Sequence, residues 1–382
     1  MALVYLDCNA TTPVAPEVVA AMLPFLREHF GNPSSAHAYA DAPRRAMAVA
    51  REDTARLIGA RAAEIVFTGS ATEANNLAIL GVARALGDAR RHAVVSAVEH
   101  PAVSEPARRL QELGWAVTVV PVDEYGRVAP GGVAAALRSD TGLVSVMHAN
   151  NEVGTIQPIA EIAAIVRAHG VPMHTDAAQS AGKVALNVEA LGVDLLTLAG
   201  HKFHAPKGVG ALYVRAGTPI TAVLAGAGQE QGLRPGTENI AQIVALGAAA
   251  RLARECLPDA SAHLRALRDR LHGRLLQAIP GLALNGHPEQ RLPNTLNVSF
   301  PGVSGAMLLQ RVADRVAAAT GSACHAGDAA PSGVLGAMGL PGARIAGAVR
   351  LSVGRYNRED EIDAAAAALI TAWRELTVAE HG

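Results

Sequence analysis

The sequence contains three lysines, Lys183, Lys202 and Lys207, among 33 basic residues, and the others are arginines. A guanidinium group cannot act as a nucleophilic amine, so lysine in an arginine-rich chain can indicate a position where the chemistry requires an amine. All three lie between residues 183 and 207, and Lys202 follows a predicted strand at 195–198. The pattern indicates where an amine-dependent reaction could occur and leaves three candidate lysines.

The three cysteines, Cys8, Cys256 and Cys324, are far apart and form no C-x-x-C pair. Their number and spacing argue against a disulfide framework and a zinc site and fit a reducing compartment. Cys324 lies among small residues at 321–327, which predicts a loop with an accessible thiol, whereas Cys256 lies on a predicted helix and is expected in the core. The residues alone leave open whether Cys324 is a nucleophile or a loop cysteine without a chemical role.

Two positions at strand ends could bind an anionic or polar ligand. Asp176 follows a predicted strand at 172–175, where carboxylates of α/β sheets contact ligands, and helix capping is the alternative. The turn at 68–75 leads from a strand into a helix whose N-terminus favours a phosphate, with ordinary capping again the alternative. This turn matches neither of the two glycine-rich nucleotide-binding motifs, G-x-x-x-x-G-K-[ST] and G-x-G-x-x-G. His201 and His204 have no carboxylate or cysteine nearby in sequence, so no metal site is expected.

Composition restricts the class of partner. The chain has 382 residues, of which 50% are apolar and 18% charged, with a formal charge of -1. Because it has no excess of basic residues, the chain is not expected to bind nucleic acid or an anionic membrane. The expected binding partner is therefore a small molecule or a protein. We find no signal-peptide pattern and no apolar run long enough to span a bilayer, so a cytoplasmic location is expected.

Short β-branched runs alternate with helical patterns between about residues 64 and 214. The predicted strands are 65–68, 93–96, 116–120, 143–147, 172–175, 195–198 and 211–214. Strands that alternate with helices predict an α/β layer with a mostly parallel sheet. After a predicted helix at 241–256, the segment 257–261 predicts a break, followed by a smaller α+β domain.

A series of short motifs occurs along nearly the whole chain. They lie at 6–13 (LDCNATTP), 30–35 (FGNPSS), 67–76 (FTGSATEANN), 99–101 (EHP), 149–155 (ANNEVGT), 174–179 (HTDAAQ), 200–208 (GHKFHAPKG), 234–239 (RPGTEN), 321–324 (GSAC) and 349–355 (VRLSVGR). In type and order these motifs resemble the cysteine desulfurase family, a branch of the class V aminotransferases that uses pyridoxal 5'-phosphate (PLP).

This resemblance implies a fold-type I PLP-dependent transferase of the α/β class. Its large PLP-binding domain, with a mostly parallel seven-stranded sheet, would span residues 14–255. A smaller α+β domain carrying the loop of Cys324 would combine residues 1–13 and 256–382. The resemblance also implies a homodimer with its active sites at the subunit interface.

The resemblance further assigns the catalytic residues Lys202, His100 and Cys324. Lys202 would hold PLP and remove the substrate α-proton as a general base. His100 would stack on the PLP ring. Cys324 would attack the substrate sulfur and take it as a persulfide, with release of alanine.

Other residues would bind the cofactor and the substrate. Asp176 would keep the PLP ring nitrogen protonated, and Gln179 would bind the phenolic oxygen. The resemblance implies that the phosphate is bound by Ala71, Thr72 and His201 of the same chain and by Thr237 of the partner subunit. It also implies that Arg350 and Asn151 bind the substrate carboxylate. Asn151 would contact the cofactor as well.

The implied reaction converts L-cysteine to L-alanine and passes the sulfur to an acceptor protein, such as an iron–sulfur scaffold. Selenocysteine lyase, which acts on L-selenocysteine, is the alternative, because Cys324-His325 and the motif at 234–239 also resemble that enzyme. The length of the loop from Cys324 to Pro331 favours the desulfurase. A generic class V aminotransferase would not need Cys324, and a non-catalytic scaffold would bind no cofactor.

Overall fold

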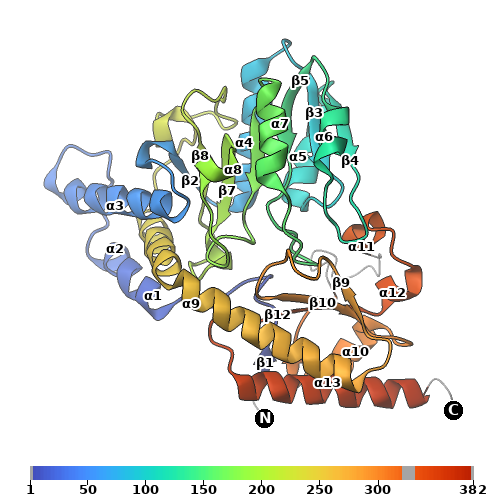
Figure 1. Ribbon diagram of the computed structural model, residues 1–382. Coiled ribbons are helices and arrows are strands. Elements are labelled where there is room, and N and C mark those ends of the chain that lie inside the picture. The colour runs from blue at the N-terminus through green and yellow to red at the C-terminus, as the bar shows by residue number, and fades with distance from the viewer. Residues whose placement is uncertain (1–2, 321–331, 380–382) are drawn as a thin grey trace.

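The structure is a computed structural model that describes residues 3–320 and 332–379. Its largest element is a seven-stranded sheet (Figure 1) with the order β2-β8-β7-β6-β5-β3-β4. In that order the strands are Ile65–Thr68, Gly210–Val214, Leu195–Ala199, Met173–Asp176, Thr141–Ser145, His92–Ser96 and Ala116–Val120. Only β8 runs antiparallel to its neighbours, β2 and β7. The mostly parallel seven-stranded sheet predicted from the sequence is confirmed.

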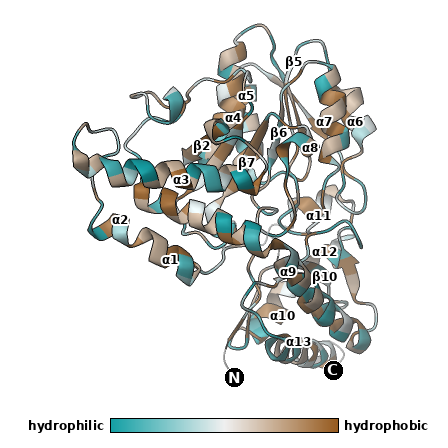
Figure 2. Cartoon of the chain, turned by 60° about the vertical axis from the view of Figure 1, so that its left-hand side comes forward, coloured by the Kyte–Doolittle hydropathy of each residue, from teal (hydrophilic) through white to brown (hydrophobic). Residues whose placement is uncertain are grey.

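Helices cover both faces of this sheet because its strands alternate buried side chains between two clusters. Val66, Val95 and Leu195 pack with α4 (Ala71–Leu86) and α5 (Pro101–Glu112). Their neighbours in the strands pack on the opposite face, against α3 (Asp41–Leu57), α6 (Pro130–Ala136), α7 (Ile159–Ala168), α8 (Val188–Leu191) and the first half of α9 (Ile240–Ala278). We call these two clusters together the sheet core. In Figure 2 its strands are mostly hydrophobic in colour, as expected of strands buried on both faces.

A second core lies below the sheet in Figure 1. It forms around an antiparallel sheet of β12 (Ala348–Ser352), β10 (Thr295–Ser299) and β9 (Ala283–Asn285). The short strand β1 (Val4–Tyr5) pairs with β11 (Val316–Ala317), so the start of the chain joins this core. The helices α10 (Gly305–Arg311) and α13 (Glu359–Ala379) and the second half of α9 cover it.

The predicted break at 257–261 is wrong, because α9 continues through Pro258 without interruption. A proline inside a helix removes one hydrogen bond and normally bends or ends the helix. Here Pro258 is exposed, so water can solvate the carbonyl group that the proline leaves without a donor. The two halves of α9 are fixed in different cores, by residues such as Leu246 in the sheet core and Leu271 in the second core. The predicted domain boundary at 255/256 therefore falls inside a helix, and the division into 14–255 and 1–13 with 256–382 stays a prediction.

The remaining elements are short and connect these layers. They are α1 (Pro16–Met22), α2 (Pro24–Arg27), α11 (Gly333–Ala337), α12 (Gly342–Ala346) and the 3-10 turns η1 (Ala38–Ala40), η2 (Ala62–Glu64), η3 (Gly200–Lys202) and η4 (Glu230–Gly232). Within residues 3–320 and 332–379, none of the helices has both the length and the apolar character needed to cross a bilayer.

Candidate active site

A cavity of about 240 Å³ opens where several strands of the seven-stranded sheet end. Its wall contains the N-terminus of α4, the turn before α5, the segments after β5 and β6, and η3 after β7. Ligands of open α/β sheets bind at the carboxyl ends of the strands. The topology therefore brings together residues that are far apart in the sequence, including Ala71, Thr72, His100, Asp176 and Lys202.

The N-terminus of α4 forms an anion-binding end of this cavity. Ser70 caps the helix, and its Oγ accepts a hydrogen bond from the backbone N–H of Glu73 at 3.1 Å. Glu73 in turn accepts from the backbone N–H of Gly69 at 2.7 Å and from Arg234 at 2.7 Å, which fixes the turn. The first N–H groups of a helix have no partner within it and favour a negative group. Ala71 and Thr72 line the cavity at this point.

Asp176 is the last residue of β6, and its side chain is buried. Its Oδ2 accepts a hydrogen bond from Asn75 Nδ2 at 2.7 Å, and its Oδ1 accepts from the backbone N–H of Ala178 at 2.8 Å. Both donors are neutral, and within the described part of the chain the carboxylate forms no ion pair. Burial of an uncompensated charge is costly. A cationic group bound in the cavity, such as a protonated ring nitrogen, would compensate it.

Lys202 ends η3, and it lines the cavity with its neighbour His201. Its Nζ donates to the backbone oxygens of Asn9 at 2.5 Å and Ala10 at 2.8 Å. The imidazole of His201 lies 3.2 Å from Thr11 Oγ1. Burial, and then the charge of Lys202, lowers the pKa of His201 to about 4. His201 is therefore neutral near pH 7 and can act as a hydrogen-bond donor beside the α4 N-terminus.

His100 is the N-cap of α5, and its ring lines the cavity. Its Nδ1 accepts a hydrogen bond from the backbone N–H of Ala102 at 3.1 Å, so Nε2 carries the proton of the neutral ring. Burial lowers the pKa of His100, and the charge of Asp176 opposes that shift. A neutral imidazole in a fixed orientation suits stacking on a ring bound in this cavity.

Gln179 and Asn151 complete the cavity on the side of the N-terminal segment. Gln179 Nε2 donates to the backbone oxygen of Asn9 at 3.0 Å, and its Oε1 accepts from Lys183 Nζ at 3.0 Å. The backbone oxygen of Asn151 accepts from Asn9 Nδ2 at 3.1 Å. Asn9 therefore holds both cavity residues through its own polar groups.

Arg350 is not on the cavity surface in this structure. Its buried guanidinium donates to Asp7 Oδ1 at 2.8 Å and to the backbone oxygen of Asn151 at 3.2 Å. The second bond places it directly behind a residue that lines the cavity. Thr237 is exposed and is also absent from the cavity wall of this chain, and Cys324 lies outside the described residues.

Four residues with contacts to this site were not among the site residues that the resemblance implied: Asp7, Asn9, Asn75 and Lys183. Asp7, Asn9 and Asn75 all belong to motifs at 6–13 and 67–76. A motif shows that a residue belongs to a pattern, but it does not show which distant side chain the residue contacts. Lys183 was one of three candidate amines, and the structure places it behind Gln179 instead of on the cavity surface.

Comparison with known proteins identifies the family of this chain. The model of the family described as aminotransferase class-V matches residues 4–365. The cysteine desulfurase IscS of Methanosarcina thermophila is 46% identical over 361 residues, which cover 94% of this chain and 89% of that protein. Cysteine desulfurase 2 of Trichormus variabilis is 46% identical and covers 95% of this chain and 91% of its own.

A solved structure described as a NifS-like protein superposes with a TM-score of 0.91 at 38% identity, covering 98% of this chain and all of that one (100%). The match extends over both cores. A second solved structure, SspA in complex with cysteine, has a TM-score of 0.82 at 36% identity over 93% of this chain and 100% of its own. The fold-type I architecture expected from the motifs is therefore confirmed. On these matches the chain belongs to the class-V aminotransferase family and, within it, to the cysteine desulfurases.

Proposed function

We propose that this protein is a PLP-dependent cysteine desulfurase that converts L-cysteine to L-alanine and retains the sulfur on Cys324. The observation that carries the proposal is the cavity of about 240 Å³, because its wall combines an amine, a buried carboxylate and a helix N-terminus. These groups are Lys202, Asp176 and the first turn of α4. The relatives at 46% identity are named cysteine desulfurases, which supports the same reaction.

The described residues fit PLP. Asp176 would face the ring nitrogen, since it is a buried carboxylate bonded only to neutral donors. The N–H groups of Ala71 and Thr72, with His201, would bind the phosphate. Gln179 would contact the phenolic oxygen, and its amide orientation is already fixed, because its Nε2 donates to the backbone oxygen of Asn9, which can only accept. When bound, PLP supplies an electron sink for negative charge at the substrate α-carbon.

Lys202 would hold the cofactor and then, once the substrate amine has replaced it, act as the general base. Its Nζ would take the proton from the substrate α-carbon and later return a proton. The two carbonyl oxygens that now accept from Nζ, those of Asn9 and Ala10, would orient the free amine during this step. His100 would keep the cofactor ring in place by stacking.

Arg350 would bind the substrate carboxylate with help from Asn151. A guanidinium forms a bidentate pair with a carboxylate and so fixes the orientation of the substrate. The hydrogen bond from Arg350 to the backbone oxygen of Asn151 supports this assignment, because it places the two groups side by side. Since Asp7 also binds Arg350 at 2.8 Å, the substrate carboxylate would have to share this arginine with Asp7.

Cys324 would accept the sulfur. Its thiolate would attack the sulfur of the bound substrate, the carbon–sulfur bond would break, and a sulfur–sulfur bond would form. With the return of a proton to carbon, L-cysteine and the enzyme thiol give L-alanine and an enzyme persulfide. No external oxidant or reductant is needed. The persulfide would then pass its sulfur to an acceptor protein such as an iron–sulfur scaffold.

We also propose a homodimer, which would bring Thr237 of the partner subunit to the phosphate. Large apolar side chains on the N-terminal helices and the loop after them are exposed in the single chain, which supports an interface on that side. They are Leu26 at 60%, Phe30 at 72% and Tyr39 at 67% exposure. The assignment to the cytoplasm stays a prediction from the sequence.

The test is the formation of alanine from L-cysteine and L-selenocysteine by the wild type, Cys324→Ala and Lys202→Ala. We expect L-cysteine turnover that disappears in both variants, together with loss of the visible absorption of lysine-bound cofactor in Lys202→Ala only. Unchanged L-cysteine turnover in Cys324→Ala would refute the persulfide step. Turnover of L-selenocysteine with little of L-cysteine would instead identify a selenocysteine lyase.

A further inference from the structure

A second, smaller cavity lies behind Lys202, on the side away from the candidate active site. Its volume is about 40 Å³, and Lys202 lines both cavities. Leu252 of the sheet-core half of α9 forms one wall, and Leu264 and Val353 of the second core form another. The cavity therefore lies between the two cores.

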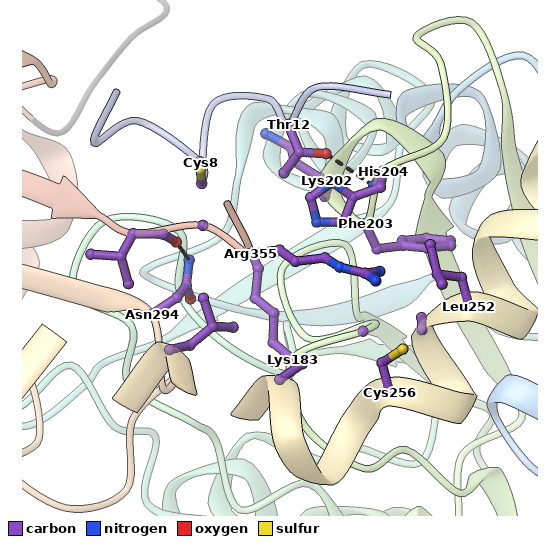
Figure 3. A pocket seen from close by; sticks show the side chains of 16 residues that line it. Cys8, Thr12, Lys183, Lys202, Phe203, His204, Leu252, Cys256, Asn294 and Arg355 are labelled. Carbon is purple, nitrogen blue, oxygen red and sulfur yellow. Dashed lines mark hydrogen bonds between the residues drawn. The ribbon is translucent and has the colours of Figure 1, made fainter. Parts of the chain in front are cut away.

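The wall of this small cavity is mostly apolar, and its lysine and arginine side chains bring only positive charge to it. Lys183, Lys202 and Arg355 all line it, and no aspartate or glutamate does. Figure 3 shows the Arg355 side chain extending across the pocket towards the side where Leu252 and Cys256 lie. Within residues 3–320 and 332–379, the guanidinium of Arg355 has no hydrogen-bond acceptor and no ion pair, and it lies 5.9 Å from the centroid of the Tyr356 ring.

Lys183 is the most deeply buried of these cations, with 5% exposure. Its Nζ donates to two neutral amide oxygens, Gln179 Oε1 at 3.0 Å and Asn9 Oδ1 at 3.5 Å, and to no other acceptor among the described residues. An ammonium group has three donors. Two of them are bonded, which leaves one N–H for a further partner, and no carboxylate of the described residues pairs with the charge.

The neighbouring thiol of Cys8 cannot act as the counterion. Burial raises the pKa of Cys8 to about 12, so the thiol is neutral at physiological pH. Burial and the charge of Lys202 lower the pKa of Lys183 to about 7 in the absence of an anion. A buried cation of this kind either loses its proton or acquires a negative partner.

We propose that this cavity binds one small monovalent anion, of the size of a halide or hydrosulfide, between Lys183 and Arg355. The volume supports this class of ligand. A cavity of about 10–15 Å³ already holds a water molecule, so 40 Å³ accommodates a single small ion with a water, whereas a phosphate or a carboxylic acid has several more heavy atoms to place. The apolar walls of Leu252, Leu264 and Phe203 suit a weakly hydrated ion.

The anion would be coupled to the candidate active site through two residues. Lys183 binds the oxygen of Gln179, and Lys202 lines both cavities. A negative charge in the small cavity would keep Lys183 protonated, and so keep Gln179 oriented with its N–H groups away from Lys183. This site goes beyond the proposed reaction and does not depend on it, since its assay measures binding of the ion.

The experiment uses the holoenzyme with sodium bromide as the probe. Crystals grown with bromide should show an anomalous scattering peak between Lys183 and Arg355, and bromide should raise the unfolding temperature above that in sodium gluconate of equal ionic strength. Gluconate is too large for the cavity, so the comparison separates binding from screening. Sodium hydrosulfide is then added to the bromide crystals to distinguish a halide from hydrosulfide as the anion. Loss of the bromide peak would identify hydrosulfide as the ligand that the cavity prefers, and a peak that remains would identify the halide.

Arg355→Gln is the principal variant, because Arg355 is only half-buried and its removal leaves the packing of both cores in place. We expect it to weaken bromide binding by about tenfold or more, as for loss of one charged partner. Arg358→Gln is the matched control, since Arg358 is exposed and pairs with Asp360. Lys183→Met should abolish the anomalous peak. The absence of a bromide peak in the wild type, its persistence in Lys183→Met, or equal bromide effects in Arg355→Gln and Arg358→Gln would overturn the proposal.

Discussion

Glu99, which precedes His100 at the candidate active site, is expected to be uncharged in the folded protein near pH 7. One carboxyl oxygen, Oε1, accepts from Ser96 Oγ and from the backbone N–H of Met147. The other, Oε2, is buried and has no hydrogen-bond partner among the described residues. Burial raises the pKa of Glu99 to about 8 against these two hydrogen bonds. Glu99→Gln keeps the accepting oxygen and removes the titration.

The size of the effect follows from the two pKa values. Between the ordinary value of 4.5 and about 8, the folded protein holds a proton on Glu99 that the unfolded chain has lost. The free energy of unfolding of the wild type therefore falls as pH rises through this window, by about 1.4 kcal/mol per pH unit for this one group. Glu99→Gln does not share this loss, so the variant should gain roughly 2–3 kcal/mol on the wild type between pH 5 and pH 7.

The assay is urea unfolding of both proteins at pH 5, 6 and 7, with cofactor and subunit concentrations held fixed. Glu105→Gln is the matched control, because Glu105 lies on the following helix, is 58% exposed and forms an ion pair with Arg108. Its difference from the wild type should stay nearly constant with pH. Parallel stability curves for the wild type and Glu99→Gln would refute the reasoning, since they would mean that Glu99 is ionised in the folded protein at neutral pH.

Three further predictions concern the cofactor, the substrate and the subunit interface. Asn75→Ala removes one of the two hydrogen bonds to Asp176. Because loss of a bond to a charged group costs about 1.5–3 kcal/mol, PLP retention on dialysis should fall by about tenfold or more. The control is Asn76→Ala, which should retain PLP like the wild type, since the Asn76 side chain donates to the backbone oxygen of Thr72. Arg350→Lys keeps the charge beside Asp7 but loses bidentate geometry, so KM for L-cysteine should rise about tenfold with little change in kcat, and an equal loss in kcat would contradict ground-state binding. Phe30→Asp should convert the dimer to a monomer in light scattering, whereas Val378→Asp, equally exposed on the last helix, should not; a dimer in both would place the interface elsewhere.

The strands and their order of appearance were predictable because each is a short run rich in apolar or β-branched residues. The helix expected to follow the strand within 68–75 is α4, and it begins at Ala71 because Ser70 supplies a standard N-cap. Pro258 misled the prediction because local propensity favours a break, and only the packing of the two halves of α9 in different cores overrides it. The antiparallel direction of β8 could not be inferred from its sequence, which is as apolar as that of β7, the neighbour to which it runs antiparallel.

The candidate site was partly predictable, because the motifs identify residue types and the topology of an α/β sheet brings strand ends together. Lys202, Asp176, His100 and Gln179 were all expected on one cavity, and the structure places them there. The sequence carries no sign of which neutral donors hold Asp176, because Asn75 lies 101 positions away from it. The same holds for Arg350 and Asp7, which lie at opposite ends of the chain and pair only in the folded structure.

Asn9 shows why the second core is needed for the site in the first. This residue is 1% exposed, and every one of its polar groups is bonded. Its backbone N–H and its side chain bind Ser352, Asn294 and Thr295 of the second core, while its backbone oxygen accepts from Gln179 and Lys202 of the cavity. A rotation of one core relative to the other would break several of these bonds at once, and an unmade buried hydrogen bond costs about 1–3 kcal/mol. The position of the Lys202 amine is therefore set by the packing between the two cores as much as by the sheet that carries it.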